Sequence, residues 1–352
     1  MSMSVSGYAA QSPTAQVTPW EFERRDPRPD DVSIDILYCG VCHTDIHQTR
    51  NGWGRSVYPM VPGHEIIGRV SGVGSKVTGF KSGDMVGVGT MVDSCRQCAA
   101  CLAGLEVYCE NNCTQTYNDK DRHDGTTTYG GYSDKIIVSD RFVLHIPDAL
   151  DPKAAGPLLC AGITTYSPLK HWKIGPGHKV AVVGLGGLGH LGLKFAKALG
   201  ADVSLFTRSA GKEEEARRLG ADHVILSTDP AQMASAGNRF DFILDTVPSA
   251  HDLNPYLATL KQDGTHILVG QLDAIDPPLL GVMLMAGRRS LVGSGAGGIA
   301  ETQEMLDFCA ERSIACDVEM INIQDINEAF ERVLKSDVRY RFVIDMASLI
   351  RE

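Results

Sequence analysis

The chain has 352 residues, 43% hydrophobic and 22% charged, which predicts a globular protein of about two domains. Its formal net charge of -10, without any block of Lys and Arg, argues against nucleic acid as a partner, because phosphate binding needs clustered cations. Residues 1–16 lack the basic start and apolar run of a signal peptide, and the longest apolar stretch, 277–286, is too short to cross a bilayer. We therefore expect a cytoplasmic protein without a membrane partner, whose ten cysteines are metal ligands or buried thiols rather than disulfides.

The region before about residue 150 is predicted to be rich in β-strands. Val32, Ile34 and Ile36 alternate with polar residues, which is the pattern of a half-buried strand. Closely spaced glycines between residues 63 and 89 indicate tight turns between short strands. Residues 92–112 hold four cysteines and little hydrophobic bulk, so we expect a lobe without a core of its own.

Beyond about residue 170, predicted strands and helices alternate. Short apolar runs predict strands over 179–184, 203–206, 224–226, 240–245 and 265–269, and helical spacing predicts helices over 188–199 and 213–219. This alternation predicts a doubly wound parallel sheet. Towards the C-terminus the sequence predicts helices over 301–312 and 326–336 and a strand over 341–344.

A glycine-rich loop lies between the first of these strands and the helix that follows. Gly184, Gly186 and Gly189 fit G-x-G-x-x-G, in which glycine permits a tight turn and a close backbone approach to a pyrophosphate. Glycine turns are common, so the motif alone is weak evidence. The strand before it and the helix after it favour a dinucleotide site over a structural turn in another α/β sheet.

The end of the second strand indicates which dinucleotide binds. An NAD site places a carboxylate there for the ribose 2′-hydroxyl, whereas this chain has Thr207, Arg208, Ser209 and Lys212. Asp202 precedes the strand and lies at its wrong end. Two cations and two hydroxyls suit a 2′-phosphate, so we predict NADP(H) over NAD(H), with a solvated basic turn as the alternative.

Four cysteines follow the pattern C-x2-C-x2-C-x7-C at Cys95, Cys98, Cys101 and Cys109. Four thiolates so close together in a lobe with little core predict a closed tetrahedral zinc site. Metal binding would supply the folding energy that the lobe lacks.

A second set of metal-binding residue types is dispersed along the chain, at Cys42, His64, Glu65 and Cys160. Their spacing does not show that they meet, and a lone histidine is more often a core residue than a ligand. Spacing alone therefore leaves the role of these four residues open.

The chain resembles the zinc-containing alcohol dehydrogenases of the medium-chain dehydrogenase/reductase superfamily, and most of all their cinnamyl alcohol dehydrogenase-like branch with its bacterial broad-range aldehyde reductases. Besides the four-cysteine lobe, the stretches that carry this resemblance are CGVCHTDIH, YPMVPGHEIIG, TYGGYSDKIIV, LLCAGITTYSPL, GLGGLGH, VGSGAGG and DVRYRFVID. The resemblance implies an α/β fold with a Rossmann domain and a β-rich GroES-like catalytic domain. We expect the catalytic domain to comprise residues 1–155 and 296–352, and the NADP-binding domain to comprise residues 156–295.

The resemblance also implies roles for the dispersed residues. Cys42, His64 and Cys160 would bind a catalytic zinc, with Glu65 as a fourth ligand of the resting site, so we expect two zinc ions per chain. Thr44 would contact the substrate oxygen, His47 would relay a proton, and Asp45 would orient the zinc-bound histidine. In this mechanism zinc polarises an aldehyde or stabilises an alkoxide while hydride passes to or from the nicotinamide.

The cofactor site expected from the motif and the resemblance spans several segments. The loop residues are Gly184, Leu185, Gly186, Gly187, Leu188 and Gly189, with Thr207, Arg208, Ser209 and Lys212 at the 2′-phosphate. The resemblance adds Thr164, Thr246, Gly270, Ser294, Gly295 and Ala296 near the nicotinamide half.

The expected activity is NADP(H)-dependent interconversion of primary alcohols and aldehydes. Gln115 stands where the lignin-forming plant enzymes carry a tryptophan, so a broad aromatic and aliphatic range is expected, with Trp53 as an aromatic wall of the pocket. Family members form dimers or tetramers, and we expect a homodimer. The alternatives are a sorbitol-type polyol dehydrogenase, a zinc-free quinone or enone reductase, and a non-enzymatic, crystallin-like NADPH-binding protein.

Overall fold

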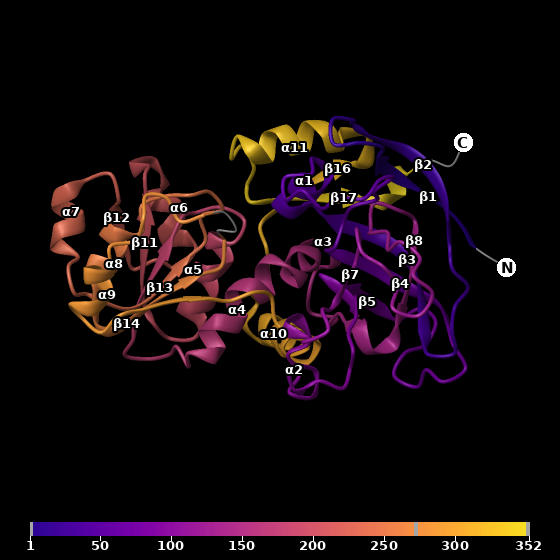
Figure 1. Cartoon of the computed structure of the whole chain (residues 1–352), viewed down its shortest axis with the longest axis horizontal. Coiled ribbons are helices and arrows are strands. Elements are labelled where there is room, and N and C mark those ends of the chain that lie inside the picture. Colours follow the sequence, from indigo (N-terminus) through magenta and orange to yellow (C-terminus); the bar gives the residue numbers. More distant parts are fainter. Residues whose placement is uncertain (1–2, 271–273, 350–352) are drawn as a thin grey trace. The chain divides into compact units, whose positions relative to one another are not determined.

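The computed structural model of the chain describes residues 3–270 and 274–349. The chain forms two compact units, one from Met1–Cys160 with Gly297–Glu352 and one from Ala161–Ala296 (Figure 1). We call them unit 1 and unit 2. The first change of unit falls after Cys160 rather than after residue 155, because the 3₁₀ turn Gly156–Leu159 packs on strands of unit 1.

Unit 2 is built on a parallel sheet. Within the described residues it has six strands in the order β12-β11-β10-β13-β14-β15, and every neighbouring pair is parallel. Their bounds are β10 Lys179–Val183, β11 Asp202–Thr207, β12 His223–Leu226, β13 Phe240–Asp245, β14 Leu260–Leu268 and β15 Ser290–Gly293. The strand order reverses between β10 and β13, which confirms the predicted doubly wound sheet.

The helices of unit 2 precede or connect these strands. They are α4 Ala161–His171, α5 Gly189–Ala198, α6 Glu213–Arg218, α7 Pro230–Ser235, α8 Asn254–Thr259 and α9 Gly281–Met285. Residues 180–183 of the central strand β10 are all apolar and buried, as expected for a parallel strand that is covered on both faces. The buried strand ends at Val183, immediately before Gly184, and so anchors the start of the glycine loop.

Unit 1 contains the larger sheet. In the part of the chain that is described, β16, β17, β3, β4, β5 and β9 follow one another in this order, and β8 also pairs with β3. The bounds are β3 Asp31–Gly40, β4 Ile66–Val73, β5 Met85–Val88, β8 Lys135–Ser139, β9 Leu144–His145, β16 Val318–Asn322 and β17 Arg341–Asp345. Because β17 pairs antiparallel with β3, the last strand of the chain lies beside the strand that leads to Cys42.

The other elements of unit 1 are shorter or lie at its edges. The helices are α1 His43–Thr49, α2 Ala99–Leu102, α3 Pro152–Ala155, α10 Ile299–Arg312 and α11 Ile326–Leu334, and the remaining strands are β1 Met3–Ala10, β2 Val17–Arg24, β6 Met91–Asp93 and β7 Thr114–Gln115. Helix α11 buries Ile326, Ala329 and Phe330, one stripe of an amphipathic helix. None of the described helices combines the length and apolar character that a membrane crossing requires.

The hairpin of β1 and β2 was not predicted. Its strands pair antiparallel from Met3↔Arg24 to Ala10↔Val17. Strand β1 is rich in Ser, Gly and Ala, which have little strand preference of their own. Backbone hydrogen bonds from Tyr8 N–H to the Tyr132 carbonyl oxygen and from Ala10 N–H to the Met60 carbonyl oxygen attach β1 to the rest of unit 1. Tertiary pairing rather than local preference therefore defines the strand.

Candidate active site and metal centres

The first metal-binding side chain is placed by the start of helix α1. Cys42 is the N-cap of α1, with an extended backbone at φ -106° and ψ 151°. Asp45, three residues later, accepts a hydrogen bond from the Cys42 backbone N–H over 2.8 Å. This reciprocal cap fixes Cys42 at the junction between strand β3 and the helix.

The dispersed residues Cys42, His64, Glu65 and Cys160 come together in unit 1. One ligand atom from each lies within 4.8 Å of the others. Cys42 Sγ is 3.7 Å from Cys160 Sγ, and His64 Nε2 is 3.3 Å from the same sulfur. Two thiolates on a tetrahedral zinc with bonds of about 2.3 Å lie about 3.7 Å apart, so the spacing suits that metal.

Glu65 completes the cluster and is paired with a residue that the sequence analysis gave no role. The side chain is fully buried, and one carboxylate oxygen accepts a hydrogen bond from Arg341 of β17. The other oxygen, Oε2, is buried without a hydrogen-bond partner. Burial raises the pKa of Glu65 to about 7, although the Arg341 charge opposes this. An orphaned oxygen beside two sulfurs and an imidazole is the donor set that zinc binds, so these residues fit the metal.

Close packing keeps this carboxylate in place. A Cβ atom on Gly40 would lie 1.9 Å from Glu65 Oε2, so a side chain there would collide with the carboxylate. Arg341 is also buried, and the charges of Glu65 and of the nearby thiols raise its pKa despite the burial. The Glu65–Arg341 pair is therefore a contact between two ionisable groups that is shielded from water.

Asp45 lies behind the imidazole of His64. Asp45 Oδ1 is 3.5 Å from His64 Nδ1 and accepts a hydrogen bond from the Gly63 backbone N–H over 3.1 Å. His64 Nε2 faces the sulfurs while Nδ1 faces the carboxylate. This arrangement suits the predicted orienting role, in which a carboxylate fixes the tautomer of a metal-binding histidine.

The predicted substrate residues Thr44 and His47 lie one helical turn apart on α1, and both are half-buried. The imidazole of His47 stacks on the indole of Trp53, with ring centroids 5.3 Å apart and an interplanar angle of 2°. The centroid of the His43 ring lies 5.0 Å from that of His47. A Cβ atom on Gly52 would lie 2.8 Å from His47 Nδ1. The indole that we expected in the pocket wall thus also holds the histidine.

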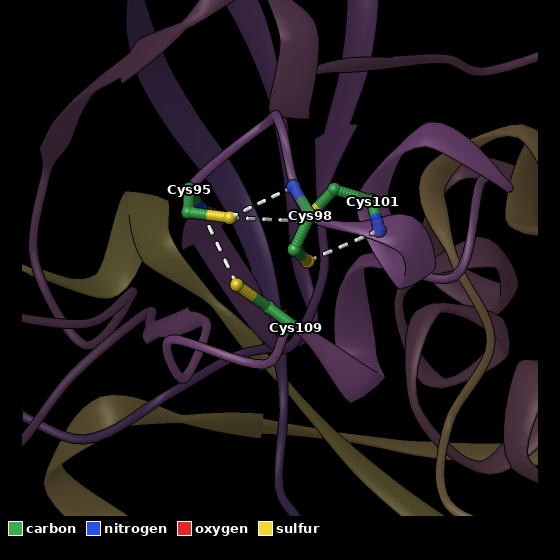
Figure 2. Close-up of side chains that lie close together, drawn as sticks. All are labelled: Cys95, Cys98, Cys101 and Cys109. Atoms are coloured by element: carbon green, nitrogen blue, oxygen red, sulfur yellow. Dashed lines mark hydrogen bonds between the residues drawn. The ribbon is translucent and has the colours of Figure 1, made fainter.

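The four-cysteine lobe forms the second cluster, shown in Figure 2. Cys95 Sγ and Cys101 Sγ are 3.9 Å apart. Backbone N–H groups also donate to the sulfurs: Cys98 N–H to Cys95 over 3.3 Å, Cys101 N–H to Cys98 over 3.5 Å, and Cys95 N–H to Cys109 over 3.4 Å. Hydrogen bonds from the Gln97 backbone and the Asn111 side chain lower the pKa of Cys95 to about 6. Such donors stabilise thiolates, which are the form that binds zinc.

The lobe has little apolar interior. Leu102, Leu105 and Tyr108 are 75%, 40% and 48% exposed. The remaining cysteines, Cys39, Cys113, Cys309 and Cys316, lie outside both clusters, and none of the ten cysteines, all within the described residues, forms a disulfide. The lobe therefore depends on its four sulfurs rather than on packing.

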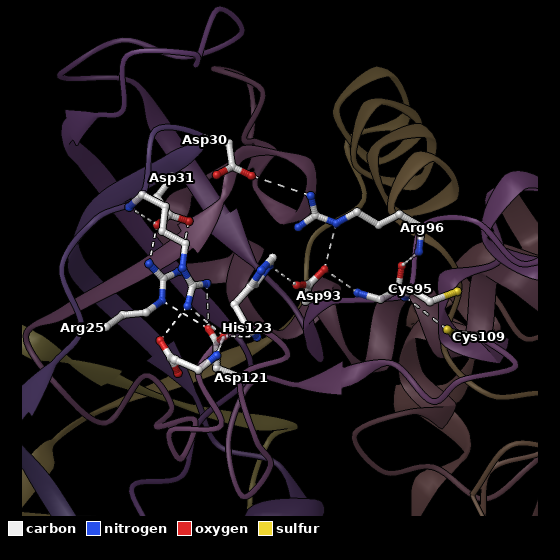
Figure 3. Close-up of polar contacts among 12 residues, drawn as sticks. Arg25, Asp30, Asp31, Asp93, Cys95, Arg96, Cys109, Asp121 and His123 are labelled. Atoms are coloured by element: carbon white, nitrogen blue, oxygen red, sulfur yellow. Dashed lines mark hydrogen bonds and ion pairs between the residues drawn. The ribbon is translucent and has the colours of Figure 1, made fainter.

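A charged network ties this lobe to the rest of unit 1 (Figure 3). Asp93 accepts hydrogen bonds from the Ser94 backbone N–H over 2.7 Å and from Arg96 Nε over 2.9 Å, and it lies 3.5 Å from His123 Nε2. Arg96 also reaches Asp30, 3.7 Å away, in the loop before β3. The four-cysteine lobe is thereby fixed to the large sheet through its first residues.

In unit 2, the glycine loop has the geometry expected of a dinucleotide site. Gly184 has φ +89°, a conformation that favours glycine, and it directly follows β10. A Cβ atom on Gly189 would lie 2.1 Å from the Gly184 carbonyl oxygen, so only glycine allows α5 to begin so close to the strand. The backbone N–H groups at the start of α5 are suited to bind a pyrophosphate.

The end of β11 carries the predicted 2′-phosphate residues. Thr207 is buried, while Arg208 and Ser209 are exposed directly after it. Lys212 is half-buried and donates from Nζ to the Leu185 carbonyl oxygen. Burial and the charge of Arg208 lower the pKa of Lys212. Two cations thus lie at this strand end, and Asp202 is at the opposite end of β11.

Other predicted cofactor residues lie around the carboxyl ends of the strands. Thr246, directly after β13, donates to the Val183 carbonyl oxygen over 2.7 Å. A Cβ atom on Gly270 would lie 2.5 Å from Thr246 C, and Ser294 N donates to the Leu268 carbonyl oxygen over 3.0 Å. Gly295 and Ala296 follow Ser294 beyond β15, Thr164 is half-buried in α4, and residues 185–188 complete the turn between β10 and α5.

Three side chains around the first cluster were not predicted from the sequence. The first is Arg341, which donates to Glu65. The second is Tyr117, whose ring stacks on that of His64 with centroids 5.8 Å apart and an interplanar angle of 12°. The third is Tyr132, whose hydroxyl donates to Asp45. Arg341 and Tyr132 lie in stretches that carried the resemblance, but an arginine or tyrosine in a strand-like segment indicates no metal site by its type.

Comparison with known proteins places this chain in a family. Residues 28–148 match the alcohol dehydrogenase GroES-like domain, and residues 187–311 match the zinc-binding dehydrogenase domain. The chain is 54% identical to the NADP-dependent alcohol dehydrogenase C 1 of Mycolicibacterium smegmatis, over 98% of this chain and 99% of that protein. It is 52% identical to the aldehyde reductase YahK of Escherichia coli, over 98% of both chains. A solved cinnamyl alcohol dehydrogenase from Sorghum bicolor superposes with a TM-score of 0.95 at 45% identity, over 98% of both chains.

The chain therefore belongs to the family of zinc-binding dehydrogenases with an alcohol dehydrogenase GroES-like domain, and it is an oxidoreductase. The resemblance to the cinnamyl alcohol dehydrogenase-like branch is confirmed, as is the combination of a GroES-like domain with a Rossmann domain.

Proposed function

We propose that this protein is a zinc-dependent alcohol dehydrogenase and aldehyde reductase that uses NADP(H) and accepts a broad range of aromatic and aliphatic substrates. The observation that carries the proposal is the meeting of Cys42, His64 and Cys160, in which Cys42 is the N-cap of the helix that carries Thr44 and His47. The names of its relatives, an NADP-dependent alcohol dehydrogenase and an aldehyde reductase, support the same reaction.

In this proposal two zinc ions bind to each chain. Cys42, His64 and Cys160, with Glu65, would hold one, and Cys95, Cys98, Cys101 and Cys109 would hold the other. Zinc at the first set supplies a Lewis acid that polarises a carbonyl group or favours ionisation of an alcohol. The four-thiolate set has no open position and would have a structural role.

The chain's own residues would bind the substrate and handle the proton. Thr44 Oγ1 would hold the substrate oxygen by a hydrogen bond, and the imidazole of His47, on the same face of α1, would take up or return the proton. Asp45 would keep His64 in the tautomer that presents Nε2 to the metal. Reduction of an aldehyde consumes one hydride, which NADPH supplies, and one proton.

The cofactor preference is argued from the end of β11. Arg208 and Lys212, with the hydroxyls of Thr207 and Ser209, would bind the 2′-phosphate, and the loop 184–189 would bind the pyrophosphate. The remaining contacts would come from Thr164, Thr246, Gly270, Ser294, Gly295 and Ala296. The absence of a carboxylate between Phe206 and Lys212 disfavours NAD(H).

We further propose a homodimer in which two copies of unit 2 meet. In the described part of unit 2, β15 has a hydrogen-bonded neighbour on one side only. Leu280, Val282 and Met285, in and beside α9, are 53%, 61% and 84% exposed. A free strand edge with apolar side chains nearby is suited to pair with its own copy about a twofold axis.

The test is a panel of aldehydes and alcohols assayed with NADPH and with NADH, together with metal analysis. We expect reduction of benzaldehyde and of aliphatic aldehydes with NADPH, little activity on sorbitol, and about two zinc ions per chain. Activity on sorbitol but not on aldehydes would favour a polyol dehydrogenase. A metal-free active protein would indicate a quinone or enone reductase, and NADPH binding without turnover would indicate a non-enzymatic protein.

A further inference from the structure

The side chain of Tyr132 reaches the first metal cluster from the segment before β8. It is fully buried, and its hydroxyl donates a hydrogen bond to Asp45 Oδ2 over 3.3 Å. Burial, together with the charge of Asp45, raises the pKa of Tyr132 well above its ordinary value. The hydroxyl therefore keeps its proton and acts as a donor towards the carboxylate.

This hydrogen bond is one of several that fix the Asp45 carboxylate. Oδ2 accepts from the Cys42 backbone N–H over 2.8 Å and from Tyr132, while Oδ1 accepts from the Gly63 backbone N–H over 3.1 Å. With both donors of Oδ2 in place, the carboxylate is held in the rotation that turns Oδ1 towards His64 Nδ1, 3.5 Å away. Tyr132 donates the longest of the three hydrogen bonds, so its contribution should be modest.

The same residue also holds the backbone that precedes His64. Tyr132 N donates to the Pro62 carbonyl oxygen over 3.0 Å, and Gly131 N donates to the Gly63 carbonyl oxygen over 2.9 Å. The tyrosine ring packs so closely that a Cβ atom on Gly63 would lie 2.7 Å from Tyr132 Cδ1. Two routes, through the backbone and through Asp45, thus lead from Tyr132 to His64.

We propose that Tyr132 is a positioning residue for the metal centre, acting through the hydrogen-bonded series Tyr132–Asp45–His64. The inference rests on the proposed function, because it assumes that His64 binds zinc. The hydroxyl holds Asp45 so that the carboxylate orients the imidazole, and loss of the hydroxyl loosens the imidazole without removing a ligand. Partners of metal ligands in general alter metal affinity in this way.

The experiment follows the release of zinc from the intact enzyme to a coloured chelator, with residual activity measured on the same samples. This identifies the zinc whose loss removes activity. Tyr132→Phe keeps the ring against Gly63 and removes only the hydroxyl. We expect it to release that zinc about three to ten times faster than the wild type, less than the 10- to 100-fold cost of losing a direct partner of a ligand. The four-cysteine zinc serves as an internal reference, and its release should not change.

Two controls separate positioning from general loosening. Tyr58→Phe removes another hydroxyl of unit 1, which donates to the Thr49 carbonyl oxygen over 2.7 Å, and should release zinc like the wild type. Tyr132→Phe should add less than about twofold in an Asp45→Asn background, because coupled residues are not additive. The inference is overturned if Tyr132→Phe matches Tyr58→Phe, or if its full effect persists with Asp45→Asn. A wild type whose activity does not depend on any zinc would overturn the proposed function, and the inference with it.

Discussion

Lys212 donates a hydrogen bond from Nζ to the carbonyl oxygen of Leu185 over 3.2 Å, so a cation from the end of β11 is held on the glycine loop of the neighbouring strand. The end of β11, expected to bind the 2′-phosphate, and the glycine loop, expected to bind the pyrophosphate, are thus linked by a hydrogen bond within the protein itself. Arg208, four residues earlier, is exposed and carries a second positive charge at the same strand end.

The first prediction concerns this strand end. Arg208→Asp should lower kcat/KM for NADPH by about 10- to 100-fold and should improve the ratio in favour of NADH, because a carboxylate repels a 2′-phosphate and accepts a hydrogen bond from a 2′-hydroxyl. Steady-state kinetics with both cofactors measure the ratio. Arg141→Asp, an equally large change of charge at an exposed site of unit 1, should leave it unchanged. An unaltered ratio in Arg208→Asp would show that this residue does not bind the phosphate.

The second prediction concerns the dispersed metal cluster. Cys42→Ala should abolish turnover and reduce the zinc content from about two to about one per chain, since a site left with fewer ligands binds zinc weakly. NADPH binding, followed by fluorescence, should change less than about twofold, because the glycine loop belongs to unit 2. Cys309→Ala removes a buried thiol outside both clusters and should keep full zinc content. Turnover by a Cys42→Ala protein with a single zinc would remove this cluster from the mechanism.

The third prediction concerns the buried pair of Glu65 and Arg341. Arg341→Met should lower the free energy of unfolding of unit 1 by about 3–5 kcal/mol, because it leaves a buried carboxylate without its partner. Denaturant unfolding of the protein measures this loss. Adding Glu65→Leu should recover part of it, since the carboxylate that lost its partner is then removed as well. For comparison, Arg50→Met breaks the exposed pair with Glu331 and should cost less than about 1 kcal/mol. A similar cost for both arginines would mean that burial gives the Glu65 pair no special importance.

The fourth prediction concerns pH and His251. Asp245 is the buried last residue of β13 and accepts hydrogen bonds from His251 Nε2 over 3.0 Å and from His266 Nε2 over 2.9 Å. Burial acts to lower the pKa of His251, but the hydrogen bond and charge of Asp245 outweigh it, and Asp252 adds to the rise.

A pKa raised in the folded state contributes stability that is fully present below the unfolded value of about 6.5 and is lost as the pH rises through the folded value. The melting temperature of the wild type should therefore exceed that of His251→Gln by more at pH 6 than at pH 8.5. His223→Gln, the same substitution at an exposed position of unit 2, provides the matched variant. A difference that stays constant between the two pH values would contradict the assignment.

The elements of unit 2 were largely predicted because buried parallel strands are continuous apolar runs. Phe240–Asp245 was predicted with the bounds that β13 has, and residues 179–184 came within one position of β10. Strand β15 was missed, since its four residues at the sheet edge are too few for a pattern. Strand β14 begins earlier than predicted, at Leu260, because Leu260 pairs with Phe240 before the register shifts to the pairing of Phe242 with Thr265.

The site was predicted unevenly, for a reason of chain distance. The four-cysteine lobe could be identified from local spacing, but Cys42 and Cys160 are 118 residues apart, and only the resemblance indicated that they meet. Glu65 and Arg341 are 276 residues apart, and their contact exists only because β17 pairs with β3. No periodicity or local motif reports such a pairing.

The position of β17 between β16 and β3 affects the order in which the two units can fold during synthesis. Domains fold as units during synthesis, and unit 2 is continuous, so it can fold once residue 296 has left the ribosome. Unit 1 can be completed only after β17 has been made, because until then Glu65 lacks the guanidinium of Arg341 and the large sheet lacks the strand between β16 and β3. A nascent chain paused just short of Arg341 would thus carry a folded unit 2 and a unit 1 in which Glu65 has no partner.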